Sequence, residues 1–190
     1  MPERSHRRRT LASWLLAALV AFGLVAPWAA RAQQRVASEA ELKAAFVYRV
    51  ALFVEWPAES LPAGASFRIC LLGADPAWAA AFAALDGKLV QGHTVAAPRL
   101  LARGEEPRAC HVLFVPEREG TRLPPWQAGL LTIGEAEGFA QAGGVVGFVR
   151  DGARLRFDLN RDAALRQQLR LPADLLKIAR NVVDAGATRP

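Results

Sequence analysis

Cys70 and Cys110 are the only two cysteines in the chain. Two thiols can form a disulfide, and an even cysteine count in an exported protein is typical of one. A bridge would close a loop of 41 residues, from 70 to 110, which would stabilise the fold by about 4 kcal/mol on a chain-entropy estimate. The alternative is two buried free thiols. Neither cysteine lies in a CxxC motif and no HxxxH pair accompanies them, so we expect no bound metal and no thiol catalysis.

Other side chains capable of catalysis are few after residue 33. The serines and histidines in that part of the chain are Ser38, Ser60, Ser66, His93 and His111. No serine lies in a GxSxG motif, and each histidine begins a predicted strand, where a structural role is expected. Gly143-Gly144 could contact an anion, but no GxGxxG or Walker motif follows. Because no nucleophile, base and orienting group are evident together, we predict no enzymatic activity and no cofactor.

The first 32 residues have the pattern of a secretory signal peptide. Three arginines at 7–9 precede an apolar run from Leu11 to Ala26, and Ala30-Arg31-Ala32 resembles a cleavage site. The apolar run is short for a membrane span of ~20 residues, although a retained anchor is the alternative. We therefore expect cleavage after residue 32 and a periplasmic product.

The net charge of the product argues against nucleic-acid binding. The whole chain carries +6, but residues 1–32 contain five of the 24 basic residues and one of the 18 acidic residues. The product is thus close to neutral and has no basic patch with interleaved aromatic residues. Its length suits a single domain. We expect an N-terminal extension at 33–37, one domain at 38–183 and a disordered tail at 184–190.

The first predicted helix is apolar around almost its whole circumference. Ser38-x-x-Glu41 is a capping box that should start this helix, and Trp56-Pro57 should end it. A helix of this kind must be covered on two sides. One hypothesis is that Val47 and Ala51 contact a partner protein or a second copy of the chain. The alternative is burial of both residues between the sheet and the C-terminal helices.

The middle of the chain alternates predicted strands and helices. Asp75-Pro76 should begin one helix, and Gly143-Gly144 should end another. The strands are predicted at 67–72, 93–97, 111–115 and 130–133, and the short helices at 76–85 and 135–142. A proline-interrupted segment at 117–129 has no continuous helix. This alternation indicates an α/β fold.

A hairpin and further helices follow. Asp151-Gly152 is a strong turn signal. A turn centred on these residues would pair Phe148 with Leu155 and Val146 with Phe157. The opposite, solvent-facing side would carry Arg154, Arg156 and Asp158. Asn160 should cap a helical region over 161–180 that Pro172 interrupts. The predicted fold class is therefore a single α/β domain, with a mixed sheet flanked by helices and a C-terminal hairpin and helices.

The C-terminal region carries more apolar side chains than one interrupted helix easily buries. They are Leu165, Leu169, Leu171, Pro172, Leu175 and Leu176. One interpretation is that all six complete the core. The other is that Leu169, Leu171, Pro172 and Leu175 line an apolar groove that binds a side chain of a partner protein.

Seven segments in order resemble the YfiR family of periplasmic proteins. They are KAAFVY at 43–48, FVEWP at 53–57, FRICLLG at 67–73, CHVLFV at 110–115, LTIG at 131–134 with GFA and GG at 138–140 and 143–144, RFDLN at 156–160, and LLKIA at 175–179. Each motif is weak alone, but their order and spacing behind a signal peptide are specific. The resemblance covers residues 40–180.

This resemblance implies a regulator and not an enzyme. Proteins of the family bind the periplasmic region of an inner-membrane diguanylate cyclase and inhibit it, which lowers cyclic di-GMP and biofilm formation. An outer-membrane lipoprotein can sequester them, and homodimers occur. The alternative hypothesis is a periplasmic sensor module that binds a small ligand in a crevice at the strand ends of an open α/β sheet. An enzyme of unknown reaction is a third hypothesis.

Overall fold

The computed structural model describes residues 37–73, 76–152 and 154–184. The predicted signal peptide, the Asp75 cap and the tail after Asp184 lie outside these residues. The helices are α2 (Glu39–Phe53), α3 (Pro76–Ala83), the 3-10 helix η2 (Glu117–Glu119), α4 (Arg161–Arg166) and α5 (Ala173–Ile178). The strands are β1 (Ile69–Leu72), β2 (Leu89–Val90), β3 (His93–Thr94), β4 (Arg99–Leu101), β5 (Val112–Val115), β6 (Leu131–Gly134), β7 (Val146–Asp151), β8 (Arg154–Asn160) and β9 (Asn181–Val183).

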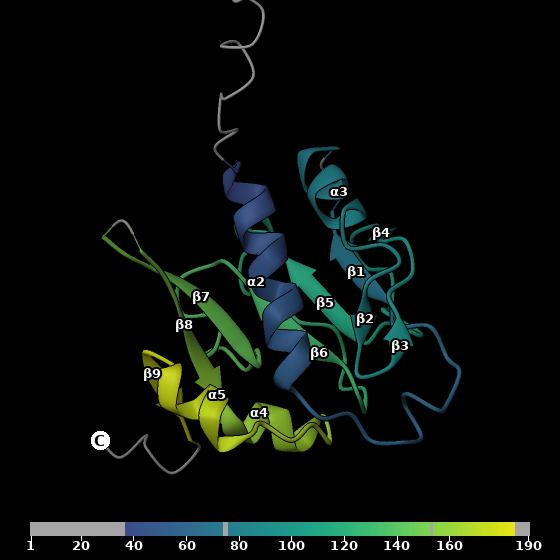
Figure 1. Cartoon of the computed structure of the whole chain (residues 1–190). Helices are drawn as coiled ribbons and strands as arrows, with labels where there is room; N and C mark the ends of the chain where they lie inside the picture. Colours follow the sequence, from purple (N-terminus) through teal and green to yellow (C-terminus); the bar gives the residue numbers. More distant parts are fainter. Residues whose placement is uncertain (1–36, 74–75, 153, 185–190) are drawn as a thin grey trace, which may run out of the picture. The chain divides into compact units, whose positions relative to one another are not determined.

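Seven of these strands form one sheet in the order β4-β1-β5-β6-β7-β8-β9, and β2 and β3 form a separate small ribbon. All neighbours in the large sheet run parallel except the antiparallel pair β7 and β8. Helices α2 and α3 lie together on one face of this sheet (Figure 1). The predicted mixed α/β sheet with flanking helices is therefore confirmed. None of the helices in the described part of the chain is long and apolar enough to cross a bilayer.

Strands β1 and β5 are apolar at every position because both faces of the sheet are covered. All four residues of β1 and all four of β5 are buried. Alternate side chains point to opposite faces. Ile69 and Leu71 of β1 join the large core under α2 and α3. Cys70 and Leu72 join a smaller cluster on the other face, where the partly buried packing residue is Leu123 from a loop.

Helix α2 begins at the predicted capping box. The Ser38 hydroxyl accepts from the Glu41 N–H at 3.2 Å, and the Glu41 carboxylate accepts from the Ser38 N–H at 2.7 Å. These reciprocal bonds satisfy two N–H groups that have no partner inside the helix. The helix ends at Phe53, because Val54 is already extended. Its core-facing stripe consists of Ala44, Val47, Val50 and Ala51.

In the middle of the chain, one sequence prediction is wrong, one is only partly confirmed, and one strand was not predicted. The predicted helix at 135–142 is a series of turns, since Gly138 takes a left-handed φ of 72° and Phe139 inserts toward the sheet. The predicted strand at 93–97 is reduced to β3. The edge strand β4, which pairs with β1, was not predicted.

The C-terminal half follows the prediction with two corrections. Asn160 caps α4 by accepting from the Ala163 N–H at 2.7 Å, and Pro172 separates α4 from α5. The hairpin register differs by two residues from the predicted one, because Asp151 pairs with Arg154 and Phe148 with Phe157. Gly152, with a φ of 59°, is therefore the first central residue of the turn.

The second correction concerns Asp158, which is 2% exposed and not solvated. Arg180 donates to its two oxygens at 2.9 and 2.7 Å, and Gln141 donates at 3.2 Å. Burial alone would raise the pKa of Asp158, but these hydrogen bonds and the charge of Arg180 outweigh it and leave the pKa below its usual value. The unpredicted strand β9 follows Arg180 directly and pairs with β8.

Candidate functional site

The predicted disulfide is present between Cys70 in β1 and Cys110, two residues before β5. Their Cα atoms are 5.9 Å apart, within the usual range for a bridge. Both cysteines are buried, at 0% and 3% exposure. Solvent hardly reaches these two residues, which is typical of a structural disulfide.

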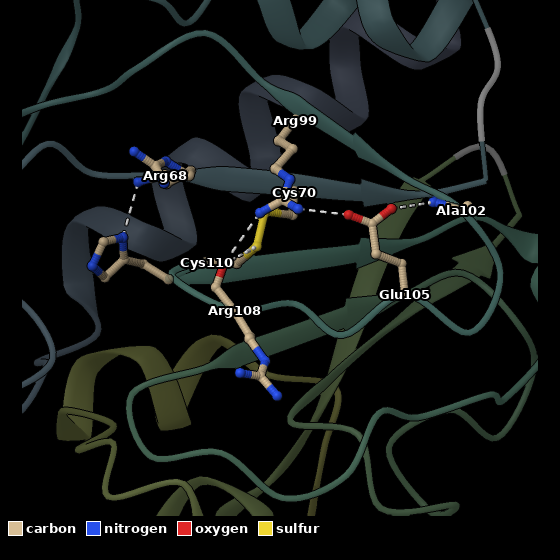
Figure 2. The surroundings of a disulfide bond; sticks show 8 residues. Arg68, Cys70, Arg99, Ala102, Glu105, Arg108 and Cys110 are labelled. Atoms are coloured by element: carbon tan, nitrogen blue, oxygen red, sulfur yellow. Dashed lines mark hydrogen bonds and ion pairs between the residues drawn. A yellow bond between two sulfur atoms is a disulfide. The ribbon is translucent and has the colours of Figure 1, made fainter.

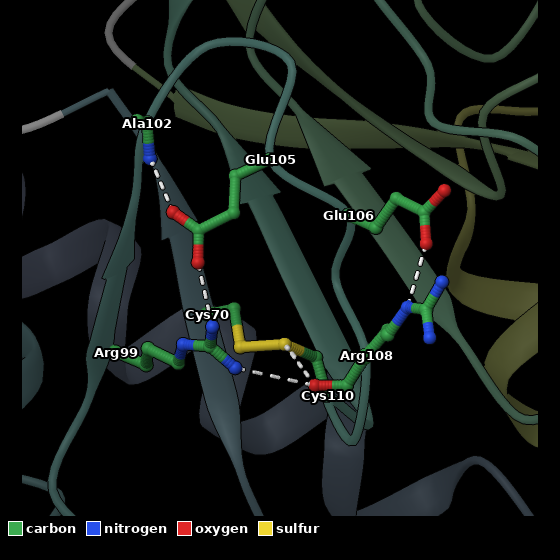
Figure 3. A network of polar contacts seen from close by, with 7 residues as sticks. All are labelled: Cys70, Arg99, Ala102, Glu105, Glu106, Arg108 and Cys110. Carbon is green, nitrogen blue, oxygen red and sulfur yellow. Dashed lines mark hydrogen bonds and ion pairs between the residues drawn. A yellow bond between two sulfur atoms is a disulfide. The ribbon is translucent and has the colours of Figure 1, made fainter.

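A polar network fixes the loop that covers the disulfide. The Glu105 carboxylate accepts from the Ala102 N–H at 3.0 Å and from the Arg99 guanidinium at 2.6 Å (Figure 3). The Ala102 hydrogen bond lowers the pKa of Glu105, and Arg99 acts in the same direction. Arg99 also donates to the Arg108 carbonyl at 3.4 Å, and Arg108 pairs with Glu106 at 2.7 Å. The network thus ties β4 to the loop before Cys110.

The two predicted structural histidines bind backbone groups. His111 Nδ1 accepts from the Arg68 N–H at 2.9 Å, a bond drawn as the dashed line at Arg68 in Figure 2, and its Nε2 lies 3.0 Å from the Ser60 carbonyl. Its ring stacks on Phe67 with 5.1 Å between centroids. Burial lowers the pKa of His111. His93 Nδ1 lies 2.8 Å from the Ala65 carbonyl. Both rings therefore serve as links between segments of the fold.

The structure places the predicted contact residues of α2 inside the core. Val47 and Ala51 are each 0% exposed and lie in the core cluster beneath the helix, so neither side chain presents a surface to a partner. The large apolar side chains that α2 exposes are Leu42 at 53%, Leu52 at 40% and Phe53 at 49%.

The residues of the predicted C-terminal groove also differ in burial. Leu169 and Leu175 are both 2% exposed and complete the core, whereas Leu171 and Pro172 are half-buried. Glu55 and Arg170 form an antiparallel bridge through two backbone hydrogen bonds of 3.0 and 3.1 Å. This bridge holds the end of α2 beside the Leu171–Pro172 segment. We call Leu52, Phe53, Leu171 and Pro172 the C-terminal apolar face.

A crevice among the described residues lies at the carboxyl ends of β1, β5 and β6. It encloses about 550 Å³, and Lys43, Trp78, Glu117 and Glu135 are among its lining residues. Strands β1 and β5 are neighbours in the sheet. The chain after β1 continues to β4 on one side of this pair, and the chain after β5 continues to β6 on the other side. Ligands favour this position in open α/β sheets. This crevice is not recognisable in the sequence as a set of residues, because its members come from four distant segments.

The charged groups in this crevice bind one another. Lys43 Nζ contacts the carboxylates of both Glu39, at 2.6 Å, and Glu135, and it lies 5.7 Å from the centre of the Trp78 ring. Burial alone would lower the pKa of Lys43, but the two carboxylates outweigh it and raise the pKa. The second oxygen of Glu135 accepts from the Glu117 N–H at 3.2 Å. The cluster therefore ties α2 to the ends of β5 and β6.

Residues 37–73, 76–152 and 154–184 contain no group of three or more His, Cys, Asp or Glu side chains placed to hold a metal ion. A sequence profile of the YfiR/HmsC-like family matches residues 40–180, which include every strand of the large sheet except β9. No curated protein matches the chain. Because the match covers well over half of the sequence, the chain belongs to the YfiR/HmsC-like family.

Proposed function

We propose that this protein binds the periplasmic region of an inner-membrane signalling protein and inhibits it. The family match over residues 40–180 carries this proposal, because the YfiR-like family is regulatory and acts in the periplasm on diguanylate cyclase signalling. The proposed target is a diguanylate cyclase, so that the protein lowers cyclic di-GMP and biofilm formation. An outer-membrane lipoprotein is a proposed antagonist.

The chemistry of the described residues supports binding over catalysis. The histidines contact backbone groups, the cysteines are joined, and the most buried carboxylates, Glu119 and Asp158, accept hydrogen bonds from arginines. A catalytic set needs a nucleophile and a base that are free to react. The polar groups of this chain are instead used to hold segments together.

We assign partner binding to the C-terminal apolar face. Contact surfaces between proteins depend on a few apolar anchors at the centre of a patch. Leu52 and Phe53 are exposed, and the neighbouring Leu171 and Pro172 are half-buried on a backbone held by the Glu55–Arg170 bridge. Such a patch is partly preorganised, because the main chain beneath it is hydrogen-bonded before the partner arrives. The buried Leu169, Leu175, Val47 and Ala51 would support this face from below.

The test is a charge placed on this face. Leu171→Glu should raise cyclic di-GMP in cells to the level of the gene deletion, because a carboxylate cannot be buried against an apolar partner without a large desolvation cost. The matched control is Leu165→Glu, since Leu165 is a 63% exposed leucine of α4 outside the defined face. Cyclic di-GMP measured by mass spectrometry in the native bacterium is the assay, with urea unfolding to show that both variants fold.

Two outcomes would contradict different parts of the proposal. If deletion of the gene leaves cyclic di-GMP unchanged, the regulatory function is wrong. If deletion raises cyclic di-GMP but a folded Leu171→Glu variant still represses it fully, the function stands and the assigned face is wrong. Oligomeric state measured by light scattering on the same variants shows whether the face also joins two copies of the chain.

A further inference from the structure

A smaller cavity lies on the face of the sheet that carries the disulfide. It encloses about 200 Å³. Its apolar lining comes from Leu72 at the end of β1, Leu113 in β5 and the loop residues Leu123, Pro124 and Pro125. Leu72 and Leu113 belong to the same buried cluster as Cys70 and Cys110. The cavity is smaller than the ~300–1,000 Å³ typical of drug-sized sites, so it suits a single ring or a short alkyl chain.

The two carboxylates at the rim of this cavity already have partners within the protein. Glu105 accepts from Arg99 at 2.6 Å and from the Ala102 N–H at 3.0 Å, and Glu106 pairs with Arg108 at 2.7 Å. Neither Arg99 nor the Ala102 N–H lines the cavity. Both negative charges at the rim are therefore offset by partners, which weakens their repulsion of an incoming anion.

Arg122, by contrast, has no ion-pair partner among the described residues, although it lines the same cavity. Glu119 is the carboxylate that interacts electrostatically with Arg122. Arg103 already binds Glu119 through two hydrogen bonds of 2.8 and 3.1 Å. Arg118 lies 3.7 Å from the same carboxylate. Glu119 is thus already bound by Arg103, so Arg122 is the cation of the cavity lining that remains for a ligand.

The pKa of Glu119 agrees with this charge distribution. Its hydrogen bond from Arg103 lowers the pKa, and the positive charges of Arg103, Arg118 and Arg122 lower it further against the opposing effect of burial. Glu119 therefore stays ionised, and both of its oxygens already accept hydrogen bonds from Arg103. In the larger crevice, Lys43 is held between Glu39 and Glu135, and Arg118, which also lines that crevice, lies 3.7 Å from Glu119.

We propose that this cavity binds a small amphipathic anion, with its ring or alkyl chain on Leu72, Leu113 and Leu123 and its anionic head at Arg122. The apolar floor supplies affinity in proportion to the buried area. The guanidinium selects for charge, because a charge-assisted hydrogen bond to an anion is stronger than one to a neutral group. This site is separate from the proposed partner-binding face and does not depend on it.

The test uses defined probes on the purified protein. Benzoate and hexanoate are titrated and compared with the neutral benzamide and hexanamide, while amide chemical shifts are followed by NMR. We expect the anions to shift the amide signals of Gly104, Leu113 and Leu123, and the neutral probes to bind about tenfold or more weakly. Arg122→Gln should remove this preference. The control Arg154→Gln, an exposed arginine of the hairpin strand β8, should retain it.

Several results would overturn the proposal. Equal binding of anionic and neutral probes, or an unchanged preference in Arg122→Gln, would show that Arg122 does not select the ligand. Shifts confined to the Lys43 and Trp78 crevice, or no shift at millimolar probe, would show that the cavity is not the site. A photo-crosslinker at Leu123 that captures the signalling protein in cells would make this groove a protein-docking surface instead. The cyclic di-GMP assay is unaffected by any of these outcomes, so the two proposals fail separately.

Discussion

Reduction of the Cys70–Cys110 bond should cost the protein a large part of its stability. The bond closes a loop with a sequence separation of 40 and joins β1 to the start of β5, two neighbouring central strands. The chain-entropy relation for a loop of this length gives about 4 kcal/mol at 25 °C. A folded domain of this size loses ~2–4 °C of Tm per kcal/mol, so we expect a fall of roughly 8–16 °C.

Urea unfolding of the oxidised and reduced protein measures this difference directly. The double variant Cys70→Ala/Cys110→Ala should unfold near the reduced wild type and should not respond to reductant, which makes it the control for side effects of the reducing agent. A difference below about 1 kcal/mol between oxidised and reduced protein would refute the reasoning. It would mean that the unfolded chain already holds these strands together, or that the bond strains the native state.

Two further predictions concern buried side chains. Asp158→Asn should destabilise the fold at pH 7 by roughly 1–3 kcal/mol, because it weakens the hydrogen bonds from Arg180. Since the folded-state pKa of Asp158 is lowered, this difference in stability should be constant above about pH 4 and should shrink as the pH falls further. Urea titrations at successive pH values measure it, and a difference that grows toward low pH would contradict the prediction. Phe139→Ala should cost ~3–5 kcal/mol. Gly144→Ala should also destabilise the fold strongly, since a Cβ there would lie 2.1 Å from the Phe139 ring. This cost should fall in the Phe139→Ala background, and a double-mutant cycle of urea midpoints would measure the difference.

The central strands were predictable because their signal is local. The runs ICLL and VLFV are short, apolar at every position and flanked by turn residues, which is typical of strands buried on both faces. The Ser38–Glu41 capping box and the Asn160 cap were also recognisable, because a cap depends on residues three positions apart. Each of these features can be recognised without knowing what packs against it.

The edge strands were not predictable for the opposite reason. Strands β4 and β9 are three residues long and partly exposed, so they carry no continuous apolar run. They form because β1 and β8 offer unpaired backbone groups beside them. The hairpin register has a similar cause. A shift of two residues keeps every side chain on its face, so the alternation of Phe148 and Phe157 fits both registers, and the turn decides between them.

The partner-contact residues on α2 were ambiguous because the helix is apolar on both sides. Two stripes fit helical spacing: Ala44, Val47 and Ala51 on one side, and Leu42, Ala45 and Leu52 on the other. Only the first stripe faces the sheet. Its small side chains allow the helix to approach the strands closely, whereas the larger leucines would hold it away. Burial against a sheet thus selects for size, a property that hydrophobicity alone does not encode.

The disulfide and the small cavity have a common physical origin in the way the second face of the sheet is covered. The first face packs against α2 and α3 (Figure 1), whereas the cluster of Cys70, Leu72 and Leu113 on the other face packs against the loop residue Leu123. Loops pack less continuously than helices, so this face needs a covalent tie and leaves a cavity beside it. The loop that Cys110 closes also supplies Gly104, Glu105 and Glu106 to the cavity. The same bond that stabilises the sheet therefore fixes one wall of the proposed ligand site.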